Sequence, residues 1–158
     1  MRRFMLLLAA ALVLPHAAFA DWKVSPDGAA LIENDGSSAL SLRCDINSNT
    51  GDVPKWLVRV DALGLSDAGP QLDMVFRFPG HAPLTLRSEN RNGFASIEGM
   101  NAPTQSDIQT LIRRLKGSSR VTIALIDSSS GTAFMDPLTF PLRGSGRAIR
   151  SVAAGCRE

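Results

Sequence analysis

The sequence is poor in the residues that build most metal and redox sites. Two cysteines and two histidines occur in 158 residues, and His81 is the only histidine after residue 20. Neither cysteine has another cysteine or a histidine near it, so the spacings of zinc sites and of Cys-x-x-Cys redox pairs are absent. Residues 45–52 are rich in side-chain oxygen but lack the spacing and the closing glutamate of a calcium loop. We therefore expect neither a metal nor a cofactor.

An excess of basic charge is missing as well. The chain has 17 basic and 15 acidic side chains, and two of the arginines lie in the first 20 residues, so the remainder carries 15 of each sign. Binding to nucleic acid needs a strong basic excess, and we expect no such partner. Arg113, Arg114 and Lys116 form the densest basic cluster. Their position near the end of a predicted helix explains these charges, and the pattern leaves open whether they bind anything.

The only long apolar run lies at the start of the chain. Two arginines precede an apolar run over residues 4–14, and residues 18–20 read Ala-Phe-Ala before a polar aspartate. This is the pattern of a secretory signal peptide. The apolar run is too short for a membrane-spanning helix, which needs about 20 apolar residues. We predict a cleaved signal peptide over 1–20 and a single exported β-rich domain over 21–158, periplasmic or secreted, without a membrane span.

The predicted export decides how Cys44 and Cys156 are interpreted. Exported proteins fold where thiols are oxidised, so two cysteines predict one intramolecular disulfide, with a free or intermolecular thiol as the alternative. Leu40, Leu42 and Cys44 alternate along one face of a predicted strand, which turns Cys44 toward the core. The pair is therefore interpreted as a structural bridge.

Strand patterns dominate the rest of the chain. Short alternating runs recur roughly every ten residues between residues 22 and 98, separated by turn sequences such as Pro26-Asp27-Gly28. Two further runs follow at 120–126 and 132–142, and Pro137 predicts a bend or an edge in the second. The pattern predicts a mainly β fold, an antiparallel β-sandwich or barrel-like sheet with two short helices. An α+β fold is the alternative.

The two predicted helices have separate signals. Between residues 104 and 116 the apolar residues recur with the spacing of one helical face: Ile108, Leu111, Ile112 and Leu115. The second helix is predicted over 146–155, after a glycine-serine-glycine turn, with Ser145 as its N-cap. Ile149 and Val152 share a face with Cys156 and direct it toward the core.

That turn is also the candidate for anion binding. It leads from a strand into a helix, so backbone N–H groups and nearby arginines are placed to hold an anion. It has neither the lysine of a P-loop nor the third glycine of a dinucleotide fingerprint, and it lacks the frame of a hydrolase elbow. The candidate anion site consists of Arg143, Gly144, Ser145, Gly146 and Arg147.

Eight residues spread along the chain carry a resemblance. They comprise an early tryptophan, an early strand cysteine, a Phe-x-Leu-x-Gly segment that leads into Ala-Ile, and a late cysteine: Trp22, Cys44, Phe140, Leu142, Gly144, Ala148, Ile149 and Cys156. In these residues the sequence resembles small periplasmic accessory proteins associated with type VI secretion and, more distantly, the invasion-associated locus B family. The resemblance implies a non-enzymatic, β-rich periplasmic module that acts through protein or envelope contacts, and it implies no catalytic residue.

The leading functional hypothesis follows from the absence of a catalytic motif. We expect a non-enzymatic periplasmic binding or accessory module of the cell envelope, whose partner is another envelope or secreted protein. A small envelope hydrolase that uses His81 or dispersed carboxylates (Glu33, Asp73, Glu89, Glu98) is the alternative. A secreted enzyme inhibitor that presents the loop 62–71 is a third reading. The sequence predicts no oligomeric state.

Overall fold

The computed structural model describes residues 21–34, 36–45, 55–91, 93–98, 102–154 and 156. The predicted signal peptide and most of the oxygen-rich segment 45–52 lie outside these residues. The described part contains strands β1 (Lys23–Val24), β2 (Ala30–Asn34), β3 (Ser38–Asp45), β4 (Lys55–Ala62), β5 (Gln71–Arg77), β6 (Leu84–Arg91), β7 (Phe94–Glu98), β8 (Arg120–Asp127) and β9 (Leu138–Pro141), the 3-10 helix η1 (Leu65–Asp67), and helices α1 (Ala102–Gly117) and α2 (Ser145–Val152).

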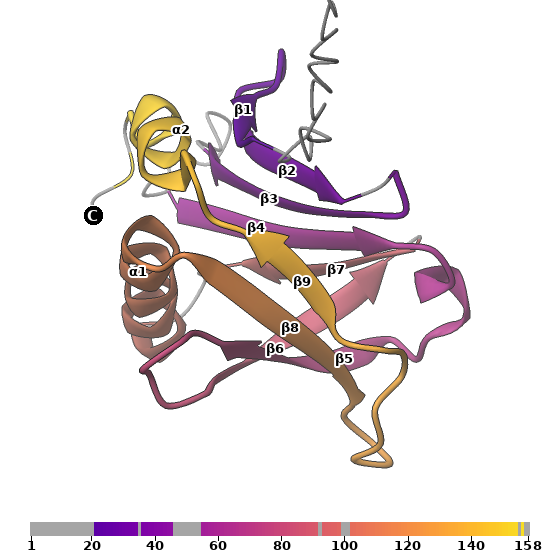
Figure 1. Ribbon diagram of the computed structural model, residues 1–158. Coiled ribbons are helices and arrows are strands. Elements are labelled where there is room, and N and C mark those ends of the chain that lie inside the picture. Colours follow the sequence, from indigo (N-terminus) through magenta and orange to yellow (C-terminus); the bar gives the residue numbers. More distant parts are fainter. Residues whose placement is uncertain are drawn as a thin grey trace, which may run out of the picture.

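All nine of these strands belong to one antiparallel sheet, in the order β1-β2-β3-β4-β7-β6-β5-β8-β9. The sheet curls into a half-barrel, and α1 and α2 lie at one end of it (Figure 1). The predicted mainly β fold is confirmed in its barrel-like form, because the strands make one sheet and not the two of a sandwich. Neither helix in the described part has an apolar stretch long enough to cross a membrane.

Period-two alternation assigns the two faces of the sheet. In β4, Trp56, Val58 and Val60 are buried, while the intervening side chains lie on the outer face. The same alternation runs through β5 and β8, whose inward residues are fully buried: Leu72, Met74, Phe76, Val121, Ile123 and Leu125. A one-residue slip in register would turn such a set outward, so burial of the inner face fixes the pairing of the strands.

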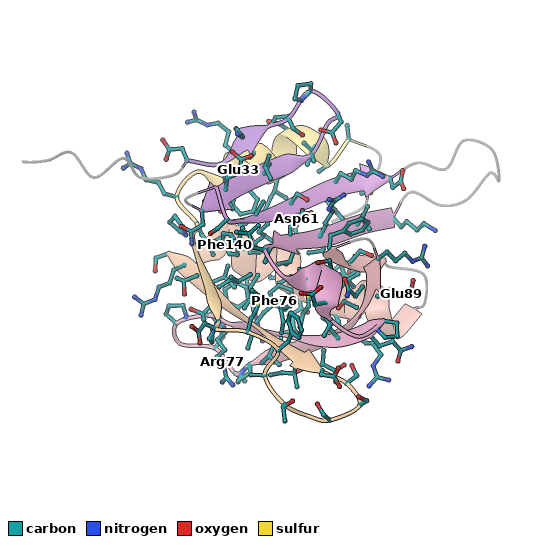
Figure 2. The ribbon with its side chains drawn as sticks, turned by 90° about the vertical axis from the view of Figure 1, so that its right-hand side faces the viewer. Glu33, Asp61, Phe76, Arg77, Glu89 and Phe140 are labelled. Atoms are coloured by element: carbon teal, nitrogen blue, oxygen red, sulfur yellow. A yellow bond between two sulfur atoms is a disulfide. The ribbon has the colours of Figure 1, made fainter. Side chains whose placement is uncertain are left out.

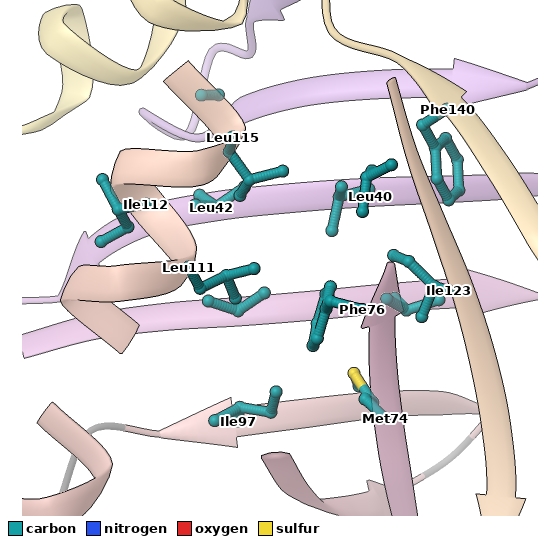
Figure 3. Close-up of a cluster of buried hydrophobic side chains, with 14 of the residues drawn as sticks. Leu40, Leu42, Met74, Phe76, Ile97, Leu111, Ile112, Leu115, Ile123 and Phe140 are labelled. Carbon is teal, nitrogen blue, oxygen red and sulfur yellow. The ribbon is translucent and has the colours of Figure 1, made fainter. Parts of the chain in front are cut away.

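Helix α1 fills the interior from the open end of the half-barrel. Its apolar stripe, predicted from the spacing, is buried, and Leu111 and Leu115 point toward the strands that carry Leu42 and Phe76 (Figure 3). The helix begins two residues before the predicted start and ends one residue after the predicted end. Replacement of Leu111 by alanine would leave a cavity in this contact, a change that typically costs about 2 to 5 kcal/mol.

The curl brings the two ends of the strand order together. The indole Nε1 of Trp22, just before β1, donates to the carbonyl oxygen of Pro141 in β9 at 3.1 Å. The amide Nδ2 of Asn34 in β2 donates to the carbonyl oxygen of Thr139 at 3.2 Å. β9 starts directly after Pro137 and is the last strand of the sheet, as the proline predicted. These side-chain bonds hold the edge strands of the half-barrel near each other.

The disulfide joins Cys44 at the end of β3 to Cys156 after α2, with 5.7 Å between the Cα atoms. The predicted pairing is therefore found in the structure. The two residues are 112 positions apart in sequence, so the bridge encloses most of the sheet and both helices. Ile149 and Val152 of α2 are buried on the side that faces the core, and Cys156 is buried with them.

We expect the Cys44→Ala/Cys156→Ala variant to lose about 4 to 5 kcal/mol in the free energy of unfolding. The chain-entropy model assigns roughly that value to a loop of about a hundred residues, because the open unfolded chain gains conformational freedom. Urea unfolding of the variant and of the reduced wild-type protein should give the same loss. Native wild-type protein whose two thiols react with an alkylating reagent without reduction would contradict the bridge.

Candidate functional site

The outer face of the sheet contains a hollow of about 380 Å³, which we call the outer hollow. It lies over β2, β3, β4 and β7, and the β1–β2 turn and the end of β6 form its rim. Its lining combines apolar side chains (Ala29, Leu31, Leu57, Phe94), serines (Ser25, Ser41, Ser96) and charged side chains (Asp27, Arg43, Arg59, Arg91).

Strand register explains why these residues meet. Leu31 pairs with Ser41, Ser41 with Arg59, and Arg59 with Ser96, so four strands place one outward residue each in a single row. Arg43 pairs with Leu57 in the adjacent row. Side chains directly opposite on one sheet face lie within contact distance. The outer hollow is therefore a product of strand pairing and not of any contiguous sequence motif.

The floor of the outer hollow is apolar. Leu31, Leu57 and Phe94 occupy outward positions, where an antiparallel sheet usually carries polar residues, and all three are half-buried. The inward neighbours of Leu57, Trp56 and Val58, are buried in the core. The sheet thus carries apolar side chains on both faces at this point. Those on the inner face are buried, whereas those on the outer face are only partly covered by protein.

Arg59 is held rigidly at the centre of the outer hollow. Its guanidinium donates to the Asp61 carboxylate, with Nε 2.9 Å from each carboxylate oxygen and Nη2 2.5 Å from Oδ1. Its Cζ also lies 3.7 Å from the centroid of the Phe94 ring, a cation–π contact. Two independent contacts therefore fix the position of this positive charge.

The other two arginines differ in how firmly they are held. Arg91 forms an ion pair with Glu89, its neighbour two positions earlier on the same face. Arg43 Nη2 is 3.6 Å from Asp45 Oδ2, which is longer than a hydrogen bond. Within the described part of the chain, the Nε of Arg43 is enclosed and has no hydrogen-bond acceptor. Of the three arginines, Arg43 is therefore the one whose contact with its acidic neighbour is longer than a hydrogen bond.

Asp27 stands at the rim, on the β1–β2 turn that the sequence predicted. The Ser25 hydroxyl donates to its Oδ1 at 2.5 Å, and the Gly28 N–H donates to the Ser25 carbonyl at 2.9 Å to close the turn. The Ser25 hydroxyl lowers the pKa of Asp27 below its ordinary value, as does the aspartate's own backbone N–H. The charges of Arg43 and Arg59 lower this pKa further. The carboxylate therefore experiences the positive potential of the outer hollow.

This arrangement suits the binding of an anionic group and was not foreseen from the sequence. Guanidinium and hydroxyl groups donate hydrogen bonds to carboxylates and phosphates, and the apolar floor accommodates a hydrocarbon body. The sequence feature that could have indicated this hollow is that Leu31, Leu57 and Phe94 are apolar residues at outward positions of their strands, where polar residues are usual. It became informative only once the strand order placed the three side chains together.

A second hollow, of about 540 Å³, lies between the β6 end and the β8–β9 connection. Its lining is polar, and its aspartate, Asp127, is engaged by its own loop. Oδ1 of Asp127 accepts hydrogen bonds from the N–H groups of Ser129 and Ser130 at 2.9 Å each and from the Ser129 hydroxyl at 2.5 Å. The Ser129 hydroxyl and these backbone groups lower the pKa of Asp127 from 3.8 to about 2. The carboxylate thus stabilises a loop.

The turn at residues 144–146 uses its serine differently from the prediction. Helix α2 begins at Ser145, and Gly144 is the N-cap with φ 84°, so the predicted serine cap is wrong. The Ser145 hydroxyl turns inward and lies 2.7 Å from the carbonyl oxygens of both Leu115 and Leu142. Leu115 is in the last turn of α1, where carbonyls lack helical partners. Ser145 therefore joins the end of α1 to the start of α2.

The remainder of the predicted anion site is on the surface. Arg143 and Arg147 are exposed beside the start of α2, and Gly146 is half-buried. The Gly144 carbonyl accepts hydrogen bonds from the N–H groups of Arg147 and Ala148 at 3.1 and 3.2 Å. Since the Ser145 hydroxyl is used inside the fold, an anion here would depend on backbone groups and exposed arginines. The site stays a prediction.

The residues of the hydrolase alternative are not brought together. The His81 side chain is exposed in the β5–β6 turn, and within the described part no hydrogen bond links its ring to a serine or a carboxylate. Glu33 pairs with Lys23 at 2.6 Å, Asp73 with Arg87 at 3.2 Å, and Glu89 with Arg91. Glu33 and Glu89 lie well apart in Figure 2. The side chain of Glu98 lies outside the described residues.

Part of the predicted basic cluster has a structural contact. Arg114 Nη1 donates to the carbonyl oxygen of Ala82 at 2.7 Å and so ties α1 to the β5–β6 turn. Arg113 is exposed on the same helix. The last turn of α1 carries Arg114 and Lys116, where positive charge complements the helix dipole. The helix thus accounts for the position of these charges.

The loop 62–71 is fastened to the sheet. The amide Nδ2 of Asn90 donates to the carbonyl oxygens of Leu65, Ala68 and Gly69 at 2.9 to 3.1 Å. Leu65 is fully buried, whereas Leu63 is 75% exposed. The Asn90 side chain and several backbone hydrogen bonds therefore hold the loop, and the large apolar side chain of Leu63 remains in solvent.

Comparisons of the chain with protein-family models, with curated proteins and with solved structures give no match. The resemblance to the type VI secretion accessory proteins and to the invasion-associated locus B family stays a prediction. Geometry is therefore the basis for a functional proposal, and the outer hollow is the place where apolar surface, unsatisfied donors and positive charge coincide.

We expect the Ser145→Ala variant to lose about 1 to 3 kcal/mol in the free energy of unfolding, because the hydroxyl that bonds the Leu115 carbonyl oxygen is removed. The Leu142 oxygen keeps the backbone N–H of residue 145 as a donor. The control is Ser151→Ala, an exposed serine of the same helix whose hydroxyl bonds the Arg147 carbonyl; its effect should stay within about 0.5 kcal/mol. Urea unfolding measures both. Equal losses would contradict the inward role, and stabilisation by phosphate in wild type alone would restore the anion site.

We expect the Asp127 carboxyl to titrate near pH 2 in the folded protein. Its pKa is lowered on folding, so its stabilising bonds are complete above the unfolded value near 4 and are lost as the pH falls through about 2. The amide proton shifts of Ser129 and Ser130, followed by NMR, should report this midpoint. Ser129→Ala should raise it, Asp127→Asn should abolish the transition, and a wild-type midpoint near 3.8 would contradict the geometry.

Proposed function

We propose that the protein is a non-enzymatic binding module of the cell envelope, periplasmic or secreted, that takes up its ligand in the outer hollow. The observation that carries this proposal is the hollow itself, in which three arginines surround an apolar floor. Pockets with a mainly apolar lining and a few directed polar groups are the usual form of a ligand site.

Two further features support export. A disulfide between residues 112 positions apart fits an oxidising compartment, and it agrees with the signal peptide predicted for residues 1–20. The resemblance to periplasmic accessory proteins points to the same compartment. Three of the carboxylates considered for a hydrolase, Glu33, Asp73 and Glu89, are each paired with a cation, which supports binding over catalysis.

The test is retention of a component from envelope extract by the immobilised protein. The Arg43→Glu variant reverses a charge inside the outer hollow, and Arg77→Glu reverses one on the outer face of β5, away from it (Figure 2). We expect wild type and Arg77→Glu to retain a component that Arg43→Glu loses about tenfold, because reversal replaces attraction by repulsion. Mass spectrometry then identifies whether it is a small molecule or a protein.

Two results would overturn the proposal. One is retention that is equal for wild type and Arg43→Glu, provided that circular dichroism shows both to be folded. The other is cleavage of peptidoglycan fragments or simple esters by the wild-type protein that disappears in His81→Ala, which would establish the hydrolase alternative.

A further inference from the structure

Resting on the proposed function, we propose that the ligand of the outer hollow is a small organic anion with an apolar body. Its anionic group would lie against Arg43, and its apolar body against Leu31, Leu57 and Phe94. The negative charge of Asp27, on the β1–β2 turn, would repel the anionic group and so lower the affinity of the hollow for the ligand.

The charge of the lining favours an anion. Three arginines and one aspartate line the outer hollow, a net charge of +2. Each arginine has an acidic neighbour two positions away on its own strand, namely Asp45, Asp61 and Glu89, and none of these acids belongs to the lining. These pairs offset part of the positive charge: Arg59 is bonded directly to Asp61 and Arg91 to Glu89, whereas Arg43 and Asp45 are 3.6 Å apart. The least compensated positive charge of the lining is therefore that of Arg43.

Arg43 is the arginine best placed to hold the anionic group. Arg59 donates from Nε and Nη2 to Asp61 and stacks on Phe94, so its charge is paired at short distance. Arg43 has only the long 3.6 Å contact to Asp45, and among the described residues its enclosed Nε has no acceptor. Because Nε is enclosed while the side chain as a whole is 41% exposed, the anionic group would meet the Nη groups, and two guanidinium nitrogens can bind a carboxylate or a phosphate in bidentate fashion.

The apolar floor and the volume define the rest of the ligand. A free inorganic anion would leave Leu31, Leu57 and Phe94 exposed to water, whereas a hydrocarbon body covers them. The hollow of about 380 Å³ holds on the order of a dozen non-hydrogen atoms, at the roughly 30 Å³ that one water occupies in the liquid. A small molecule fits this space, and a folded partner would contact the rim alone.

Asp27 lowers the affinity for such a ligand. Its carboxylate is exposed at the rim and is held there by the Ser25 hydroxyl at 2.5 Å. The Ser25 hydroxyl, which donates to this carboxylate, favours its charged form, and a bound anion near Arg43 would be repelled by that negative charge. Removal of the charge without loss of shape, as in Asp27→Asn, should therefore strengthen binding.

The experiment uses three probes on the full exported chain with its disulfide intact: octanoate, octanol and inorganic phosphate. Calorimetry gives the dissociation constants, and NMR amide shifts locate the site. We expect octanoate to bind about tenfold more tightly than octanol or phosphate, with shifts at Leu57 and Phe94. Arg43→Gln should weaken octanoate binding about tenfold, Arg77→Gln should not change it, and Asp27→Asn should strengthen it about threefold at low salt.

Each other result has a defined meaning. Phosphate that binds as tightly as octanoate indicates a simple anion site, and octanol that binds as tightly indicates an apolar patch; both overturn the inference. Shifts outside the hollow, or the absence of any response to Arg43→Gln and Asp27→Asn in folded variants, also overturn it. A dimer in sedimentation whose interface covers the outer hollow would also overturn the inference.

The proposed function can be judged separately. If an extract component is retained through Arg43 while octanoate does not bind, the ligand class is wrong and the binding module stands. Octanoate binding that depends on Arg43 and Asp27 supports the ligand class, whatever the extract retains.

Discussion

The curl of one antiparallel sheet around an apolar interior is the constraint on which the rest of the structure depends. Because side chains alternate across a strand, the curl commits one set to the core and leaves the other on the outer face. Inward residues and α1 fill the interior. The same curl brings β2 near β9, where the Trp22 indole and the Asn34 amide find backbone acceptors. The outer face of the sheet is thereby left in contact with solvent.

The end of the half-barrel is held by contacts between segments far apart in sequence. The disulfide fixes the segment after α2 to β3, and the Ser145 hydroxyl fixes the start of α2 to the end of α1. On the outer face, arginines lie two positions from acids on the same strand. Such exposed ion pairs add little stability individually, but they orient the guanidinium groups. The buried core and the lining of the outer hollow thus consist largely of different residues, on opposite faces of the same strands.

Local patterns predicted much of the fold and little of the site. The alternation in β4 and β5, the helical spacing in α1 and the Cys44–Cys156 pairing are all found. The predicted N-cap role of Ser145 is wrong because a serine hydroxyl near a helix start can either accept from a helix N–H or donate to a carbonyl. Here it donates to the Leu115 carbonyl oxygen inside the fold. The outer hollow was missed because β4 pairs with β7 and not with β5. The sequence of a single strand does not indicate which distant strand it pairs with.

Composition and periodicity predicted the mainly β class of fold, the alternation in several of the strands and the disulfide. These features depend on local spacing and on the presence of only two cysteines. The neighbours of each strand depend on how nine strands share one sheet, which only the folded chain settles. That step brought Leu31, Arg43, Leu57, Arg59 and Phe94 together from four strands. A hollow made by strand register exists only after the strands have paired, so its residues carry no common signal along the chain.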